Sequence, residues 1–347
     1  MVHDDSGGPP LDLHGRPARS LRISVTDRCN LRCAYCMPER EYTWLERSDL
    51  LSYEEIAALA DAFSDVGVDR ARLTGGEPLL RRDLEALIGL LAAREGLREV
   101  ALTTNGVQLA GRAADLRRAG LDRLTVSLDT LRPDVFRDLT RRDELAAVLA
   151  GIDDACAAGF EALKLDTVVL RGTNDGELAD LLDFARERGI EVRFIEYMDV
   201  GGATRWMPEH VVSQRELLAR VAAARGRPEP LPDRGSAPAQ RYRLPDGQVF
   251  GVIASTTAPF CGACDRSRLT ADGRWFLCLY ARDGLDLRGL LRGGATRAEL
   301  AARLARVWGG RADRGAEARL AEAERGALLD VERLRADPHL EMHTRGG

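Results

Sequence analysis

Three cysteines near the start of the chain have the spacing of a metal-binding loop. Cys29, Cys33 and Cys36 form a C-x3-C-x2-C pattern directly after an apolar, β-rich stretch. Three cysteine ligands on a [4Fe–4S] cluster leave one iron without a protein ligand, whereas a cluster that only transfers electrons usually has four. The spacing therefore predicts an iron–sulfur cluster with one iron open to a small molecule.

A zinc site and a disulfide are the two other interpretations of these cysteines. A structural zinc site takes four ligands, and the nearest histidine, His14, lies outside the pattern. The odd number of cysteines in the group disfavours disulfide pairing. A non-catalytic zinc-binding interaction protein remains the alternative from a different functional class.

A second group of three cysteines lies in the C-terminal third. Cys261, Cys264 and Cys278 form a C-x2-C-x13-C pattern without an adjacent histidine. A zinc ribbon normally presents two C-x2-C pairs, so the missing fourth ligand predicts a second cluster with an open iron. The seventh cysteine, Cys156, lies in an apolar helical stretch and is predicted to be a buried small residue.

Basic side chains near the second cysteines suggest a phosphorylated ligand. Arg266 and Arg268 alternate along a β-rich stretch, and guanidinium groups bind phosphate oxygens in a bidentate manner. In so arginine-rich a chain the same pair also fits a solvated strand face. Lys164 is the only lysine among 50 Lys and Arg residues, so it marks either a position that requires a compact ammonium group or a chance survivor.

Alternating strands and helices must position these groups. Strands are predicted at residues 21–26, 71–74, 100–104, 123–128, 163–170 and 191–197, and helices at 53–66, 82–93, 145–158 and 177–188. This order predicts repeated βα units in a partial or complete barrel, with the chemistry at the C-terminal ends of the strands. Residues 74–78 (TGGEP) directly follow a predicted strand, where glycine would let the backbone approach a ligand closely.

The character of the chain changes after the last of these strands. Residues 226–240 are rich in Pro, Gly and Arg, which places a boundary between a barrel at 1–225 and a C-terminal module at 226–347. In the module, a hairpin is predicted at 241–244 and 249–254, a second at Asp272-Gly273, and helical segments near 297–307 and 315–335.

The composition of the chain indicates which kinds of partner it can bind. The 347 residues carry a formal charge of −5, with 45% apolar and 30% charged residues, which is typical of a globular protein without the basic field of a nucleic-acid binder. The first fifteen residues lack an apolar signal segment, and no run reaches membrane-spanning length. We therefore predict a cytoplasmic protein acting on a small molecule, with neither nucleic acid nor membrane as partner.

Longer motifs around these residues resemble the radical S-adenosylmethionine (SAM) superfamily and, within it, the GTP 3′,8-cyclase family of molybdenum cofactor biosynthesis. They are residues 22–29 (RISVTDRC), 103–106 (TTNG), 193–201 (RFIEYMDVG) and 260–279, within a match from about Asp12 to the terminal glycines. The resemblance implies an α/β fold, an incomplete (β/α)6 TIM-like barrel closed by a C-terminal α+β module that carries the second cluster.

The resemblance also implies a role for each matching residue. SAM would occupy the open iron of the first [4Fe–4S] cluster, and GTP would bind the second through its purine ring. SAM-binding residues would be Tyr35, Gly76, Ser127 and Met198, and GTP-binding residues would be Arg22, Arg72, Thr103, Lys164, Arg266 and Arg268. The catalytic tail would be Gly346 and Gly347, although Arg345 precedes them where the family generally carries an aliphatic residue.

The implied reaction is the first step of molybdopterin biosynthesis. A 5′-deoxyadenosyl radical from SAM would abstract the C3′ hydrogen of GTP, and attack on C8 would give (8S)-3′,8-cyclo-7,8-dihydroguanosine 5′-triphosphate. Implied partners are a flavodoxin- or ferredoxin-type reductant and a downstream cyclic pyranopterin monophosphate synthase, with a monomer or homodimer as the assembly. Another auxiliary-cluster radical SAM enzyme, such as a peptide maturase, is the alternative within the superfamily, and Arg266, Arg268 and the glycine tail disfavour it.

Overall fold

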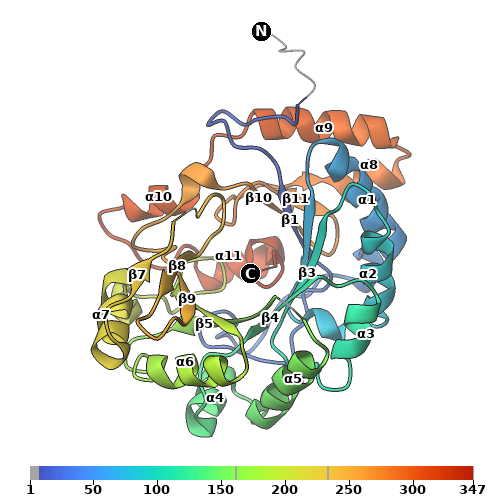
Figure 1. The fold of residues 1–347 in the computed structure, drawn as a ribbon. Coiled ribbons are helices and arrows are strands. Elements are labelled where there is room, and N and C mark those ends of the chain that lie inside the picture. Colours follow the sequence, from blue (N-terminus) through green and yellow to red (C-terminus); the bar gives the residue numbers. More distant parts are fainter. Residues whose placement is uncertain (1–7, 161, 233, 347) are drawn as a thin grey trace.

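The computed structural model describes residues 8–160, 162–232 and 234–346, and within them the strands form one twelve-stranded sheet (Figure 1). The strand order is β12-β11-β10-β1-β2-β3-β4-β5-β6-β9-β8-β7. The strands are β1 (Ser20–Ser24), β2 (Arg70–Thr74), β3 (Glu99–Thr104), β4 (Arg123–Ser127), β5 (Leu163–Val169), β6 (Glu191–Glu196), β7 (Glu229–Pro230), β8 (Gln240–Arg243), β9 (Val249–Ile253), β10 (Arg266–Leu269), β11 (Arg274–Phe276) and β12 (Leu285–Asp286).

Helices surround the curled sheet, as the predicted βα units require (Figure 1). Each of the six predicted strands lies within one residue of an observed strand at both ends, except at the C-terminal end of β1, and each pairs in parallel with its neighbours in the sheet. The helices are α1 (Tyr53–Asp65), α2 (Leu84–Ala92), α3 (Ala113–Arg118), α4 (Pro133–Thr140), α5 (Leu145–Ala157), α6 (Leu178–Glu187), α7 (Gln214–Arg225), α8 (Leu287–Arg292), α9 (Arg297–Gly309), α10 (Gly315–Leu320) and α11 (Val331–Ala336). The predicted incomplete (β/α)6 barrel is confirmed.

Alternation along each strand separates the core from the interior of the barrel. On β5, Leu163, Leu165 and Val169 are buried in the hydrophobic core, whereas Lys164 and Asp166 line the central cavity. Successive side chains of a strand point to opposite faces, so one strand serves both the core and the cavity. This alternation is why charged residues occur within strands that are otherwise apolar.

The C-terminal part extends the sheet at both edges. Strand β9 pairs in parallel with β6, and β10 pairs in parallel with β1 at the opposite edge. The connection between them, residues 254–265, therefore crosses the open side of the barrel. Both predicted hairpins are present, as β8–β9 and β10–β11.

The helical segment expected near residues 315–335 is interrupted. Helix α10 ends at Leu320 and α11 begins only at Val331, after the N-cap side chain of Asp330. Between them, Arg325 makes an ion pair of 2.7 Å with the buried Asp199, and Gly326 follows. The ion pair holds Arg325 against Asp199, and glycine disfavours a helix. The segment between α10 and α11 is therefore not helical.

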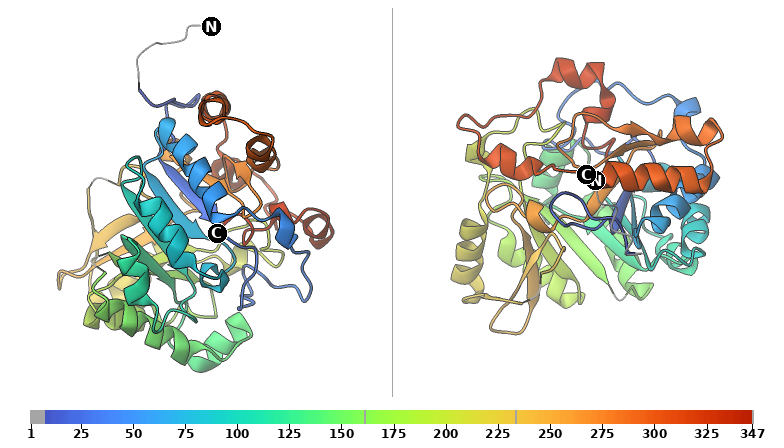
Figure 2. Two further views of the ribbon diagram at one scale, coloured as in Figure 1. Left: turned by 90° about the vertical axis from the view of Figure 1, so that its right-hand side faces the viewer. Right: turned by 90° about the horizontal axis from the view of Figure 1, so that it is seen from above.

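The C-terminal helices pack beside the helices of the barrel. In the side view, the orange and red helices lie together on one side of the molecule, next to the blue helix α1 (Figure 2). Helices α8 and α9 contact α1, and their buried residues belong to the same hydrophobic core. Among the described residues, no helix has the length and apolar character needed to cross a membrane.

Candidate functional site

One cavity of about 460 Å³ lies inside the barrel and collects both cysteine groups. Cys29, Cys33 and Cys36 lie on the loop after β1, and this loop is fixed to the end of α4 by a bond of 2.8 Å from the Ala34 amide to the Leu139 carbonyl. Burial raises the pKa of the Cys29 thiol to about 11 and also raises the pKa values of Cys33 and Cys36. Thiols of this kind become thiolates when a metal replaces their protons.

The glycine turn after β2 packs against the chain that leads into the first cysteine. The Gly76 amide donates to the Thr26 carbonyl at 2.8 Å, and a Cβ at Gly76 would lie 2.2 Å from the Arg28 carbonyl oxygen. We expected glycine there because of a close ligand. The structure supplies a different reason, since a side chain would push the turn away from the cysteine loop.

Glu77 joins this turn to the next strand. Its buried carboxylate accepts bonds of 2.7 Å from the Thr104 hydroxyl and the Asn105 amide, and Asn105 Nδ2 lies 3.8 Å from Cys29 Sγ. Burial raises the pKa of Glu77. The TGGEP and TTNG motifs therefore support the cysteine loop as one unit.

The residues predicted to bind SAM all line the same cavity: Tyr35, Gly76, Ser127 and Met198. The Tyr35 hydroxyl donates to Asp129 Oδ2 at 2.7 Å, and the Val168 amide donates to Asp129 Oδ1 at 2.9 Å. Burial raises the pKa of Asp129 to about 6. The sequence analysis did not select Asp129, although its position directly after β4 was the available signal.

The second cysteine group closes the open side of the barrel. Cys261 and Cys264 lie on the connection between β9 and β10, Cys278 follows β11, and all three line the cavity. Burial alone would raise the pKa of Cys264, but the guanidinium groups of Arg266 and Arg311 outweigh it and lower the pKa to about 7. A Cβ at Gly315 would lie 3.0 Å from Cys278 Sγ, so glycine leaves room beside this thiol.

Both groups fit iron–sulfur clusters with an open iron. Each offers three thiols as soft donors, and the partly buried thiols face a common cavity. Within the described ranges, no three His, Cys, Asp or Glu side chains form a site for a single ion. Thiolate ligands without a fourth protein donor are what such clusters require.

The residues predicted to bind GTP form one wall of the cavity: Arg22, Arg72, Thr103, Lys164, Arg266 and Arg268. Arg22 lies in register with Arg72 on one side and with Arg268 on the other. Burial and repulsion from Arg268 and Arg72 hold the pKa of Arg22 well below its usual range. Guanidinium groups this close together, shielded in part from solvent, favour a bound polyanion.

Ion pairs that the sequence analysis missed complete this wall. Lys164 Nζ lies 2.7 Å from Glu191 Oε1, and Arg193 Nε lies 2.6 Å from Asp166 Oδ1. Arg70 lies two residues before Arg72 on the same strand face. That period of two was the signal that would have added Arg70 to the predicted set.

The C-terminal tail enters the cavity. Gly346 has φ of 69°, and a Cβ there would lie 2.3 Å from Thr74 Cγ2. Arg268 and Arg22 both donate to its carbonyl oxygen. Gly347, predicted together with Gly346, lies outside the described residues.

Arg345 is packed inside the protein. Its Nη1 donates to the Leu279 carbonyl at 2.8 Å, its Nε donates to the His339 carbonyl, and its guanidinium lies 4.0 Å from the centroid of the Phe276 ring. Burial lowers the pKa of Arg345 to about 10. Arginine at this position, where the resemblance implies an aliphatic residue, therefore anchors the tail through polar contacts.

Comparisons with known proteins agree with this arrangement. The Radical SAM superfamily model matches residues 23–185, and the Molybdenum Cofactor Synthesis C model matches residues 190–317. GTP 3′,8-cyclase 3 of Mycobacterium bovis is 55% identical over 98% of this chain and 91% of the relative. GTP 3′,8-cyclase 1 of Mycobacterium tuberculosis is 56% identical over 94% of this chain and 92% of the relative.

A solved structure shares the fold. The crystal structure of Streptococcus suis SuiB bound to S-adenosylmethionine has a TM-score of 0.61 at 14% identity, over 88% of this chain and 68% of that chain. At this identity the likeness concerns the architecture alone.

Proposed function

We propose a role for each part of the cavity, starting from the premise that the chain belongs to the GTP 3′,8-cyclase family of the radical SAM superfamily. One relative is 56% identical over 94% of the chain. The protein is thus a lyase that converts GTP to (8S)-3′,8-cyclo-7,8-dihydroguanosine 5′-triphosphate at the first step of molybdenum cofactor biosynthesis. Its cofactors are S-adenosylmethionine and two [4Fe–4S] clusters.

The β1 loop is assigned to the first cluster and to SAM. When bound, this cluster and SAM supply one-electron cleavage and the radical that acts on GTP. Cys29, Cys33 and Cys36 would hold the cluster, and Tyr35 is fixed by its bond to Asp129. Gly76, Ser127 and Met198 line the adjoining part of the cavity, where SAM is expected to lie.

The arginine wall and the second cysteine group are assigned to GTP. The register of Arg72, Arg22 and Arg268 is the single observation that carries this assignment. It brings together three cations, one buried and two half-buried, in the cavity that Cys261, Cys264 and Cys278 also line. A triphosphate would offset the repulsion between these arginines. The same wall of the cavity also includes Arg266, Lys164 and Thr103. The purine ring would occupy the open iron of the second cluster.

The tail is assigned to the reacting end of the substrate. Gly346 reaches the arginine wall through its carbonyl oxygen. Its lack of a side chain allows contact with Thr74 on β2. By the family resemblance, Gly346 and Gly347 are proposed as the catalytic tail, whose role would be to exclude water and orient the ribose.

The division into residues 1–225 and 226–347 also stays a proposal. The two parts share one sheet, since β9 and β10 pair with β6 and β1. Limited proteolysis tests the boundary, with first cleavage expected in residues 226–240.

The finer partner assignments rest on the family. We propose a flavodoxin- or ferredoxin-type electron donor, a downstream cyclic pyranopterin monophosphate synthase, a monomer or homodimer, and a cytoplasmic location. A surface hollow lined by Arg40, Arg141, Arg205, Arg335 and Glu39 supports an acidic donor. Arg141 and Arg205 donate to the Pro38 carbonyl, two residues after Cys36, so this basic surface adjoins the first cysteine loop.

An anaerobic reconstitution tests the function. The loaded protein is assayed for iron and sulfide and then incubated with dithionite, SAM and GTP. About eight irons per chain, as two four-iron clusters require, GTP-dependent 5′-deoxyadenosine and a cyclised guanosine triphosphate are expected. SAM cleavage that ignores GTP would contradict the substrate, and zinc in place of iron would contradict both cofactor and substrate.

A further inference from the structure

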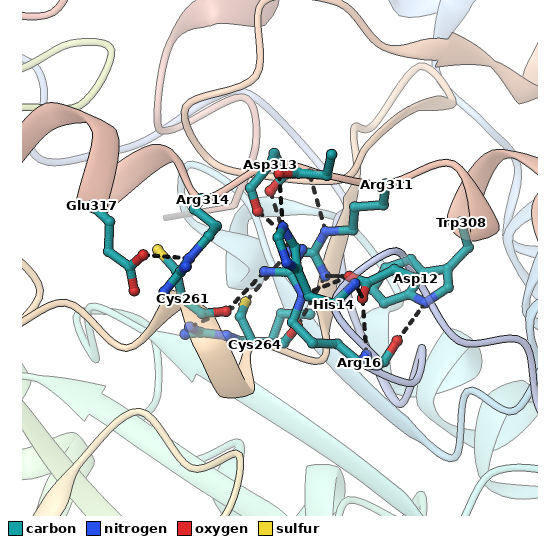
Figure 3. A network of polar contacts seen from close by, with 12 residues as sticks. Asp12, His14, Arg16, Cys261, Cys264, Trp308, Arg311, Asp313, Arg314 and Glu317 are labelled. Carbon is teal, nitrogen blue, oxygen red and sulfur yellow. Dashed lines mark hydrogen bonds and ion pairs between the residues drawn. The ribbon is translucent and has the colours of Figure 1, made fainter.

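One buried carboxylate holds two arginines beside the second cysteine group (Figure 3). Asp12 Oδ2 lies 2.5 Å from Arg16 Nε and 3.8 Å from Arg311 Nη1. The side chains of Asp12, Arg16 and Arg311 are exposed by only 0%, 2% and 1%. Buried ions of this kind are costly unless they are paired, so the carboxylate and both cations depend on one another.

Each arginine reaches one cysteine of the second group. Arg16 Nη1 donates to the Cys261 carbonyl at 2.8 Å. Arg311 Nη1 donates to the Cys264 carbonyl at 2.9 Å, and its Nη2 lies 3.7 Å from Cys264 Sγ. Arg16 and Arg311 thereby hold the two ends of the short turn Cys261–Ala263 (Figure 3).

The two arginines are themselves fixed by the ends of neighbouring elements. Arg16 Nη2 donates to the Asp313 carbonyl at 3.0 Å, and Arg311 Nε donates to Asp313 Oδ2 at 3.0 Å. Trp308 on α9 donates to the Arg16 carbonyl at 2.9 Å, and its ring lies 4.6 Å from the Arg311 guanidinium. These contacts hold each guanidinium group against its cysteine.

We propose that Asp12, Arg16 and Arg311 are positioning residues of the second cluster. Asp12 orients the Arg16 guanidinium and offsets the charge of Arg311, which Asp313 orients. Arg16 holds the Cys261 end of the turn, and Arg311 holds the Cys264 end and donates to the Cys264 sulfur. Hydrogen bonds to cluster sulfurs stabilise the more negative, reduced state and so set the reduction potential. The inference rests on the proposed function, because it needs a cluster at this cysteine group.

Two variants test the proposal on the anaerobically reconstituted full chain. Arg311→Gln should keep about eight irons per chain, as two four-iron clusters require, and shift the second cluster to a more negative reduction potential without moving the first. Arg311→Lys, which keeps the charge and loses the fork of donors, should shift it less. Asp12→Asn leaves the buried Arg16 without its carboxylate, while Arg311 keeps Asp313, and should reduce the content toward about four irons, the first cluster alone.

Asp65→Asn is the matched control, because it removes the exposed Asp65–Arg297 pair between α1 and α9. It should hold both clusters at wild-type potentials, measured by spectroscopically monitored redox titration with iron and sulfide analysis. An unchanged potential in Arg311→Gln together with a full second cluster in Asp12→Asn would overturn the proposal. If Asp12→Asn does not fold, the potential of Arg311→Gln decides alone. A wild-type protein with only one cluster, or without GTP turnover, would instead contradict the proposed function.

Discussion

Arg22 of β1 and Arg268 of β10 lie in register across a parallel strand pair, and both donate a hydrogen bond to the carbonyl oxygen of Gly346. The end of the chain thus meets the two cations at the edge where the C-terminal part joins the barrel. Guanidinium groups are charged hydrogen-bond donors, so their position at this edge suits a bound anion.

Arg22→Gln tests the charge of this wall. We expect GTP to bind at least about tenfold more weakly, since one charge-assisted hydrogen bond contributes about 1.5–3 kcal/mol. In the ligand-free protein the substitution relieves repulsion with Arg268 and Arg72 and also removes the bond to the Gly346 carbonyl, so the rise in unfolding temperature that GTP causes is the readout. Thermal unfolding with and without GTP measures this rise. Arg303→Gln on the exposed face of α9 is the control, and an equal GTP-induced shift in both variants would contradict the assignment.

Lys164→Met tests whether the only lysine of the chain binds GTP. Lys164 Nζ is 2.7 Å from Glu191 Oε1, while Arg241 also lies 2.7 Å from Glu191. Loss of the ammonium group should weaken GTP binding by about tenfold or more, and Glu191 keeps a partner, so stability should change little. Lys164→Arg tests whether positive charge alone is enough for GTP binding, because a planar guanidinium has the charge of an ammonium group but not its compact shape. Calorimetric titration of the cluster-loaded protein with GTP is the measurement, and full affinity in Lys164→Met would refute the role.

The ion pairs of His339 predict a pH dependence of the tail. Burial opposes the imidazolium, but bonds of 2.7 Å to Asp272 and 2.9 Å to Asp337 outweigh it and raise the pKa of His339. A raised histidine pKa contributes stability that is complete below about pH 6.5 and is lost as the pH rises through the folded-state pKa. The lowered pKa of Asp272 acts only at more acidic pH.

As the pH rises above about 6.5, the unfolding temperature should therefore fall by more in the wild type than in His339→Gln. Thermal scans across this range compare the two proteins. Parallel curves would show that the protonated histidine does not contribute to stability.

The sequence predicted those features that depend on local pattern and missed those that depend on distant partners. The six barrel strands follow from alternating apolar runs, and the cysteine groups follow from their spacing. The reason for Gly76 could not be predicted, because its neighbour Arg28 lies on another strand connection. Asp12 and Arg311 are almost three hundred residues apart, so no periodicity links them. The edge positions of β9 and β10 likewise depend on how the barrel closes, which no short segment encodes.

Arg345→Ile tests whether this arginine seats the tail. The variant leaves the Leu279 and His339 carbonyls without their donor, and each buried unpaired group costs about 1–3 kcal/mol. The tail should then detach, and the carbonyl of Gly346 should leave Arg22 and Arg268. We expect SAM cleavage to continue while the yield of cyclised product per 5′-deoxyadenosine falls several-fold, because the radical and the ribose are no longer held in contact.

Susceptibility of the tail to carboxypeptidase supplies a readout independent of turnover. Arg345→Ile should be trimmed faster than the wild type, whereas Arg303→Ile, an exposed change on α9, should behave as the wild type does. Arg345→Lys should be trimmed at a rate between those of Arg345→Ile and the wild type. Lysine keeps the charge above Phe276, but its single ammonium group cannot reach both carbonyls as the planar guanidinium does. Wild-type product yield and wild-type trimming in Arg345→Ile would show that the remaining contacts of the tail are sufficient, and that an aliphatic side chain serves this position equally well.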